Sequence, residues 1–333
     1  MRHFPRREQG AALLSVLILV GVMGAIAATM LDRMRLATLL AANAFGQEQA
    51  RAYALVGETL AIARIDDLLA GASGKTTLRG GWNGRTTPLP LPAGLALARV
   101  SDGGNCFNLN SLVVRGGPEQ LASRPIGIGQ FAALMDVLEV APAAARRIAA
   151  SAADFIDSDD GANREGAEDS VYARARVPYR TSGTLMAEAS ELRAVDGMTP
   201  TIHQRLKPWL CALPLAELSP LNVNTLAPAQ APLLAMLLPE SIGGPQQRLR
   251  LAQQALAERP AAGWDGAVEF ANTPALRDSP LAEDALQQLQ VRTRWFALAL
   301  RVETGETILR ETALVDARQS PARIAARRWT GED

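Results

Sequence analysis

An uninterrupted apolar run at residues 11–30 constrains the fold of this chain more than any other feature. It holds no charged side chain, and at ~1.5 Å per residue it forms about 30 Å of helix, enough to cross the hydrocarbon core of a bilayer. Arg2, Arg6 and Arg7 precede it. Positive charge on a short flank stays in the cytoplasm, so the sequence predicts a single-pass membrane protein with a large domain on the far side.

Three interpretations of this run differ in what happens to it. One is a secretory signal removed at a small-residue site, residues 25–27, and another is an ordinary anchor that is never cut. The third starts from Gly10 and Ala11, which join the basic leader to the apolar run. This junction resembles the leader of type IV prepilins and pseudopilins, which is cleaved on the cytoplasmic side after the glycine, so that the apolar helix stays on the mature protein.

The residues that follow favour the third interpretation. No proline lies between Pro5 and Pro88, helix-forming residues dominate, and apolar residues recur at helical spacings. Gly71 and Gly74 then supply a stop. A helix over residues 11–69 would be ~88 Å long, and a cleaved signal would leave half of it unexplained. We therefore expect an α+β, pilin-like fold: a long N-terminal transmembrane and amphipathic helix packed on an antiparallel sheet, with a large inserted all-helical domain.

Composition and motifs argue against several classes of function. Lys+Arg and Asp+Glu balance at 34 each, so no basic excess points to nucleic acid as the main partner. His203 is the one histidine outside the leader, and we find neither a complete nucleophile motif nor a zinc spacing. Residues 71–76 look like the end of a phosphate-binding loop, but Leu69 stands where its first glycine belongs. Gly127 and Gly129 follow no predicted strand. We expect no enzyme.

Strand-like segments bracket the middle of the chain. Residues 95–100 and 106–110 flank a turn signal at 102–105, which predicts a hairpin. The segment Phe-Asn-Leu-Asn-Ser-Leu at 107–112 returns as Leu-Asn-Val-Asn-Thr-Leu at 221–226. Chance similarity of two strand-to-helix junctions would explain this echo, because Asn, Ser and Thr are natural caps. We favour two neighbouring strands that bracket an inserted domain.

The two cysteines support this bracket. Cys106 and Cys211 would sit at the neck of the insertion if the chain leaves and rejoins the sheet at one edge. Beyond the membrane, two cysteines favour a disulfide, and closing about 105 residues would remove ~4.7 kcal/mol of conformational entropy from the unfolded chain. Two unpaired buried thiols are the alternative.

Helical periodicity marks the insertion at residues 128–138 and 142–156. Residues 190–206 predict two further helices around a turn at Gly197, with Thr199 capping the second. This resembles a helix-hairpin-helix, a fold often used to grip the DNA backbone. The turn lacks the second glycine that lets phosphate approach the backbone amides, so we favour a structural helical hairpin.

An acidic cluster lies between these helices, where residues 154–169 hold seven carboxylates and one arginine. Carboxylates packed in a turn repel one another unless a hard cation joins them, and oxygens on a flexible loop suit calcium. The run is not an EF-hand, because Gly161 and Ala162 stand at an oxygen ligand and at the invariant glycine. A solvated acidic loop is the alternative. The calcium ligands that we predict are Asp157, Asp159, Asp160, Glu168 and Asp169.

Several segments in colinear order carry a family resemblance. They are the junction Gly10/Ala11 and residues 107–110, 154–159, 166–169, 178–180, 190–193 and 221–225. Together, over about residues 1–226, they resemble the minor pseudopilin K family of type II secretion systems. The resemblance implies a tip subunit of a short periplasmic pseudopilus with minor pseudopilins I and J, with pseudopilin H and the major pseudopilin G as further partners. It also implies cleavage by a prepilin peptidase after Gly10, N-methylation of Ala11, an inner-membrane location and calcium at the acidic loop.

Ser15 is the fifth residue after the predicted cut, where most pilins carry a glutamate. In a filament, that carboxylate neutralises the N-terminal amine of a neighbouring subunit inside an apolar core, where an unpaired charge is costly. A subunit at the tip has no neighbour above it, and the K family resembles this sequence in lacking the acid. We therefore take Ser15 as a marker of the tip position.

The expected layout follows from these features. It has a leader at 1–10, a transmembrane helix at 11–30, a periplasmic extension at 31–70, a pilin-like head at 71–110 and 212–333, and the inserted helical domain at 111–211. Residues 294–302 and 306–315 predict a C-terminal hairpin, whose strands we expect to join those at Cys106 and Leu221 in the sheet on the long helix. Two other functions stay open: a minor pilin of a type IV pilus, and a membrane-anchored DNA-binding protein that uses the helical hairpin.

Overall fold

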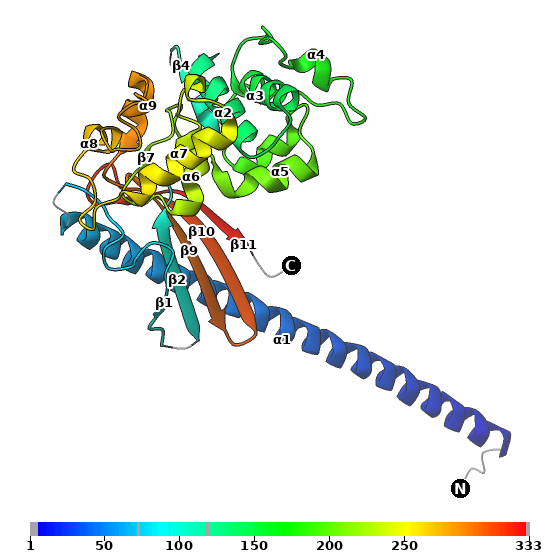
Figure 1. Ribbon diagram of the computed structural model, residues 1–333. Coiled ribbons are helices and arrows are strands. Elements are labelled where there is room, and N and C mark those ends of the chain that lie inside the picture. Colours follow the sequence, from blue (N-terminus) through cyan, green and yellow to red (C-terminus); the bar gives the residue numbers. More distant parts are fainter. Residues whose placement is uncertain (1–5, 72–73, 93, 118–119, 331–333) are drawn as a thin grey trace.

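The long N-terminal helix is present as predicted. In the computed structural model, which describes residues 6–71, 74–92, 94–117 and 120–330, α1 (Arg6–Ala70) runs for 65 residues without a break. It ends directly before Gly71, the predicted stop. Figure 1 shows its N-terminal half extending away from the rest of the protein, while its C-terminal half lies along a sheet.

A five-stranded antiparallel sheet packs on the C-terminal half of α1. In spatial order its strands are β1 (Thr86–Leu89), β2 (Leu95–Asp102), β9 (Trp295–Thr304), β10 (Thr307–Asp316) and β11 (Arg323–Thr330). The predicted C-terminal hairpin is confirmed as β9 and β10. Phe296, Leu298 and Leu300 of β9 share an apolar cluster with Ala61 and Ile65 of α1. Alternate residues of β9 are buried because one face of the sheet is covered by the helix.

The predicted hairpin between residues 95–100 and 106–110 is wrong. β2 pairs with β1 and β9 instead, and the chain follows β9 as far as Gly103, whose N–H continues the ladder. The side chain of Asp102 then accepts a hydrogen bond from the N–H of Gly104 at 2.9 Å. This local cap bends the chain away from the sheet at the point where the sequence suggested a reversal.

The strands at Cys106 and Leu221 do not join the main sheet either, so that expectation is also wrong. β3 (Phe107–Asn108) pairs in parallel with β6 (Leu210–Cys211), and β7 (Leu221–Asn222) pairs in parallel with β8 (Leu289–Gln290). Each small pair closes a helical unit of its own. We call residues 107–211 the first unit and residues 221–290 the second unit.

Both units are mainly helical and share one core. The first contains α2 (Pro125–Val137), α3 (Pro142–Ile156), α4 (Asp169–Tyr172), α5 (Pro200–Leu206) and the short hairpin β4 (Val113–Arg115) and β5 (Leu121–Ser123); the second contains α6 (Ala231–Ala235), α7 (Pro245–Ala257), α8 (Ala267–Ala271) and α9 (Glu283–Gln288). One apolar cluster runs from Phe107 to Leu289 through both units, past Cys211, where the sequence placed the end of the inserted domain. The domain boundaries stay a prediction. Figure 1 shows both units beyond one end of the sheet, away from the free half of α1.

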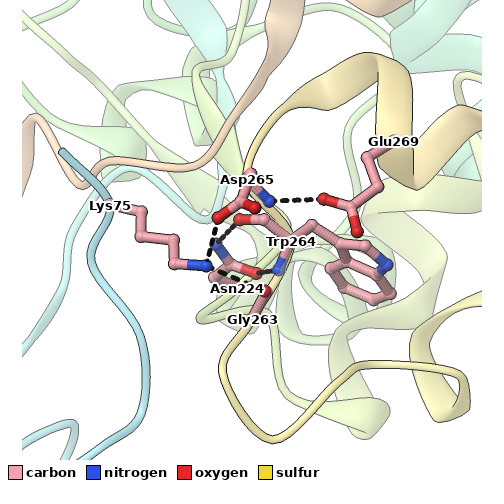
Figure 2. Close-up of polar contacts among 6 residues, drawn as sticks. All are labelled: Lys75, Asn224, Gly263, Trp264, Asp265 and Glu269. Carbon is pink, nitrogen blue, oxygen red and sulfur yellow. Dashed lines mark hydrogen bonds and ion pairs between the residues drawn. The ribbon is translucent and has the colours of Figure 1, made fainter. Parts of the chain in front are cut away.

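Two equivalent asparagines of the repeated motif, Asn110 and Asn224, hold distant segments just after β3 and β7; we call them the paired asparagines. Asn110 Oδ1 accepts a hydrogen bond from the N–H of Met186 at 2.8 Å, and its Nδ2 donates to the carbonyl of Met186 at 2.9 Å. Asn224 binds Trp264 in the same way, at 2.7 and 2.9 Å (Figure 2). Each side-chain amide thus forms hydrogen bonds with both the N–H and the carbonyl of one distant residue, as a neighbouring strand would. The echo in the sequence is a structural repeat in which each copy opens its own unit.

A partly buried carboxylate joins the sheet to the second unit. Asp102, at the end of β2, accepts hydrogen bonds at its Oδ2 from the hydroxyls of Thr225 and Thr293, both at 2.6 Å. Burial raises the pKa of Asp102 in spite of these hydrogen bonds. Since Thr225 follows β7 and Thr293 follows β8, this one side chain holds both strands of the second unit against the end of the sheet.

A second buried acid makes the stability of the sheet depend on pH. Glu311 of β10 is 1% exposed and lies between Glu58 of α1 and Arg327 of β11, which pairs with Glu58 and lies 3.6 Å from Glu311. Burial and the neighbouring Glu58 raise the pKa of Glu311 to about 8. Burial also acts on Glu58, but its hydrogen bonds to Arg327 and Glu311 outweigh burial and lower its pKa.

We expect Glu311→Gln to remove a loss of stability at high pH. Glu311 is protonated in the folded state up to about pH 8, whereas the unfolded chain releases this proton near the ordinary value of 4.5. The free energy of unfolding of the native chain therefore falls as the pH rises through this window. In urea unfolding at pH 8 the variant should be more stable by on the order of 2 kcal/mol. Glu306→Gln, at an exposed position of the same hairpin, is the control, and parallel pH profiles for the Glu311→Gln and native chains would contradict the assignment.

Candidate functional site

The acidic cluster lies at the C-terminal end of α3 and in the loop that follows. Asp154 is fully buried in the last turn of the helix and accepts a hydrogen bond from the N–H of Asn163 at 3.1 Å. Asp157 caps the same helix end, and Glu168 lies at the far end of the loop, directly before α4. The loop folds back on itself, so that Glu168 lies within reach of the charges of Asp154 and Asp157.

Two carboxylate oxygens in this loop are buried without a hydrogen-bond donor. Asp157 Oδ2 accepts from the hydroxyl of Ser123 at 2.6 Å, but Asp157 Oδ1 and Glu168 Oε1 find no partner among the described residues. Burial, together with neighbouring carboxylates, raises the pKa of Asp157 to about 6 and that of Glu168 to about 7. Buried carboxylates in this state are stabilised by a proton or by a cation.

The predicted ligands come together only in part. Asp157 and Glu168 do, whereas Asp159 accepts a hydrogen bond from the N–H of Gly161 at 2.8 Å and, like Asp160, is exposed. Within the described parts of the chain, no three His, Cys, Asp or Glu side chains lie close enough together to hold a metal ion.

Two acids are placed differently from the sequence prediction. Asp169 Oδ1 accepts hydrogen bonds from the N–H and the hydroxyl of Thr181 at 2.9 and 3.0 Å, and the backbone bond holds the pKa of Asp169 below its usual range. Asp154, which the sequence analysis did not name as a ligand, occupies the inner position. Its spacing was a usable signal, because Asp157 lies three positions further along the chain and one turn of α3 therefore carries both to the same face.

The predicted disulfide is confirmed. Cys106 and Cys211 are bonded, with their Cα atoms 5.8 Å apart and a sequence separation of 105. Cys211 is the last residue of β6, and Cys106 directly precedes β3, the strand with which β6 pairs. The bridge therefore ties the beginning of the first unit to its end.

The free half of α1 exposes its large apolar side chains. Among the described helices, α1 is the one long and apolar enough to cross a membrane, and none of its most apolar window is buried. Exposure continues past the predicted span, at Leu31, Met34, Leu36, Leu39, Leu40 and Phe45. Ser15, in this apolar stretch, is uncharged, and its hydroxyl donates a hydrogen bond to the carbonyl of Ala11 at 2.9 Å. An apolar surface of this extent indicates membrane anchoring and contact with other proteins.

The segments that resemble nucleic-acid or nucleotide motifs have structural contacts. At Gly197, where φ is +80°, an added Cβ would lie 3.3 Å from Ile148 of α3, so the turn of the helical hairpin packs closely against α3. Lys75 donates to the carbonyl of Gly263 at 3.0 Å and pairs with Asp265 at 2.5 Å (Figure 2). The ammonium of Lys75 therefore links the connector after α1 to the second unit, and its charge is already paired with Asp265.

Comparisons with known proteins decide the family. Two family models, both described as type II secretion system (T2SS) protein K, match residues 105–215 and 221–292. The chain belongs to the type II secretion system protein K family. Protein K of Pectobacterium carotovorum subsp. carotovorum is 31% identical over 326 residues, covering 98% of this chain and 97% of the relative, and that of Klebsiella pneumoniae is 32% identical over 323 residues, covering 97% of each.

A solved structure of the protein K family has the same fold. A chain in the crystal structure of the GspK-GspI-GspJ complex from the type 2 secretion system of enterotoxigenic Escherichia coli matches with a TM-score of 0.72 and 29% identity, covering 86% of this chain and 97% of that chain. The matches to the two protein K models divide between residues 215 and 221. This is the stretch between the two helical units, so the units opened by the paired asparagines correspond to the two parts that define the family.

Proposed function

We propose that this protein is a minor pseudopilin that initiates or caps the pseudopilus of a type II secretion system together with minor pseudopilins I and J. The observation that carries the proposal is the free half of α1, whose apolar side chains stay exposed both within and beyond the length that crosses a bilayer. A relative is found in one complex with GspI and GspJ, which supports these partners. The role is structural and not enzymatic, with pseudopilins H and G as further filament neighbours.

The proposed topology follows from the charge and length of the N-terminus. The basic leader stays in the cytoplasm, residues 11–30 cross the inner membrane, and the head lies in the periplasm. A prepilin peptidase cuts between Gly10 and Ala11, and Ala11 becomes N-methylated. Retention of α1 after the cut leaves the apolar surface at residues 31–45 available to pack against the equivalent helices of I and J.

Co-purification tests this function. The full chain is co-expressed with pseudopilins I and J, extracted in mild detergent and captured by a C-terminal tag. The native chain should retain both partners, whereas the double variant Leu36→Glu/Leu40→Glu, which places two charges on the exposed apolar face, should retain at least tenfold less. Gln47→Glu, which adds a charge at an exposed polar position of the same helix, is the control. Failure of the native chain to retain I and J would contradict the proposal.

We further propose that the acidic loop binds calcium. The support is the pair of buried oxygens without donors, Asp157 Oδ1 and Glu168 Oε1, together with the oxygen-rich surroundings that calcium prefers. Asp154, Asp159 and Asp160 are the neighbouring carboxylates; the remaining predicted ligand, Asp169, would first have to release Thr181. The ion would offset the burial and the carboxylate repulsion that raise both pKa values, and it would fix the loop between α3 and α4.

Calcium should stabilise the protein, and more so as the pH rises. Without metal, the raised pKa values mean that the free energy of unfolding falls between about pH 4 and 7, because the folded state holds protons that the unfolded chain releases. Calcium needs the ionised carboxylates, so its affinity should increase from pH 6 to pH 8. At 100 times the dissociation constant, it should add about 2.7 kcal/mol.

Thermal unfolding with calcium and with a chelator measures this effect. Asp157→Asn/Glu168→Gln should abolish the response to calcium, and Asp278→Asn, an exposed acid of the second unit, should leave it intact. A melting temperature of the native chain that does not change with calcium at pH 8 would contradict the proposed site.

Ser15 is the residue that we propose keeps this subunit at the tip. A glutamate at this position would have to pair with the N-terminal amine of a subunit above it, because an unpaired carboxylate in the apolar core is costly. Ser15→Glu should therefore spread the protein along the filament and reduce secretion, as seen by immunogold labelling and by assay of an exported protein. Ser15→Ala is the control. Labelling along the filament with unchanged secretion would contradict a strict tip role.

A further inference from the structure

A cationic cavity lies beside the helical hairpin of the first unit. It has a volume of about 440 Å³ and is lined by Arg193, His203 and Lys207 together with Ser190, Thr199 and Gln204. Arg193 comes from the 3₁₀ turn Ala189–Ala194, His203 from α5, and Lys207 from the turn Lys207–Trp209 that follows it. Three consecutive elements thus bring one basic group each to a single hollow.

The basic groups of this cavity lack counterions. Among the described residues, neither Arg193 nor Lys207 has an ion-pair partner, and none of the residues that line the cavity is acidic. The nearby acids are engaged elsewhere: Asp196 pairs with Arg147, Glu191 caps the turn by accepting from the N–H groups of Ala187 and Glu188, and Glu188 pairs with Arg328 and accepts from Ser190. The last basic group of α5, Arg205, binds the carbonyls of Leu138 and Glu139 on another side of the helix.

We infer that this cavity is a binding site for a phosphate group, held by the guanidinium of Arg193 and the ammonium of Lys207, with the ring N–H of His203 as a further donor. An arginine fork matches two phosphate oxygens and a lysine supplies a mobile point charge. Two permanent cations, beside a histidine that can gain a proton as an anion binds, suit an anion with up to two charges better than a single carboxylate. Because the cavity is larger than one phosphate ion needs, a phosphate-bearing lipid headgroup and free phosphate are both possible sources of the same chemistry.

His203 reports directly on occupancy. Burial, with the charges of Arg193 and Lys207, lowers the pKa of His203 in the empty cavity. A bound phosphate reverses the sign of the local field, and an opposite charge within ~4–6 Å raises a histidine pKa by about one unit or more. His203 is one of two histidines in the chain, and the other is His3, so His3→Gln leaves a single imidazole signal.

The experiment is an NMR titration of full-length His3→Gln protein in non-ionic detergent, labelled with carbon-13 at the histidine ring. The pKa of His203 is measured in sodium chloride and in inorganic phosphate at matched ionic strength. Phosphate should raise it saturably by about one unit relative to chloride. In Arg193→Gln/Lys207→Gln the pKa should start higher, because the repulsion is gone, and should no longer respond to phosphate. Arg174→Gln, which removes an exposed cation elsewhere in the first unit, should behave like the parent.

A second probe separates the two sources. Tighter binding of glycerol 3-phosphate than of inorganic phosphate assigns the site to a lipid headgroup, and equal or weaker binding assigns it to free phosphate. The inference is overturned if phosphate shifts the pKa of His203 no more than chloride does, or if the double variant responds as strongly as the parent.

Discussion

Asn110→Ala is expected to lower the free energy of unfolding by about 3 to 6 kcal/mol, the largest effect of any substitution argued from this fold. The amide is buried and serves three backbone groups: the N–H and the carbonyl of Met186, and the carbonyl of Leu213 at 2.8 Å. Each of these groups loses its partner in a site that water does not reach, and an unsatisfied buried group costs about 1 to 3 kcal/mol. The loss should also loosen the end of the first unit, which follows Met186.

Urea unfolding of the purified chain tests this, with two matched variants. Asn224→Ala removes the equivalent contacts of the second unit, where two backbone groups of Trp264 lose their partner, so its effect should be smaller, about 2 to 4 kcal/mol. Asn272→Ala, whose amide donates one exposed hydrogen bond to the carbonyl of Val268, should cost less than about 1 kcal/mol. If all three variants unfolded alike, the paired asparagines would not be the structural core of the two units.

Cys106→Ala/Cys211→Ala is expected to cost about 2 to 5 kcal/mol. The bridge closes a loop with a sequence separation of 105, and the loop-entropy model assigns ~4.7 kcal/mol to a loop of this length. The first unit depends on the bridge because β3 and β6 share only two paired positions, too few to hold its ends together without help.

Reductant supplies the control for the disulfide prediction. It should destabilise the native chain by a similar amount and leave the double variant unchanged. A variant as stable as the native protein would mean that the hydrogen bonds of Asn108 to the carbonyls of Leu215 and Glu217 hold the neck of the unit without the bridge.

Local patterns in the sequence predicted local structure well. The absence of proline and the helical spacing of apolar residues predicted α1, and Gly71 predicted its end. Alternation on either side of a Gly turn predicted β9 and β10, and two cysteines beyond a membrane predicted the disulfide. The helix and the hairpin depend on residues that are close in sequence. The disulfide can be predicted because the chain has only two cysteines.

Pairing between segments that are far apart in the chain could not be predicted from local sequence patterns. Residues 95–102 have the same strand signal whether they pair with residues 106–110 or with β9. In the structure they pair with β9, and Asp102 caps Gly104 where the chain leaves the sheet. The Asn-X-Asn echo was visible, but Asn110 and Asn224 act on Met186 and Trp264, which no spacing rule identifies. The same limit applies to the acidic loop. Asp169 was predicted as a ligand from its position, yet its carboxylate accepts hydrogen bonds from Thr181, whereas Asp154, which was not predicted, is the buried acid at the end of α3.

The central claim, that this member of the protein K family is a processed pseudopilin with a retained apolar helix, is tested most directly by the intact mass and N-terminal sequence of the protein recovered from membranes. The account predicts a chain that begins at Ala11, carries one N-methyl group and keeps all of α1 beyond the cut. A chain that begins near Ala28 would mean a removed secretory signal and a protein released from the membrane. The exposed apolar half of α1 would then be lost, and with it the argument for assembly into a filament.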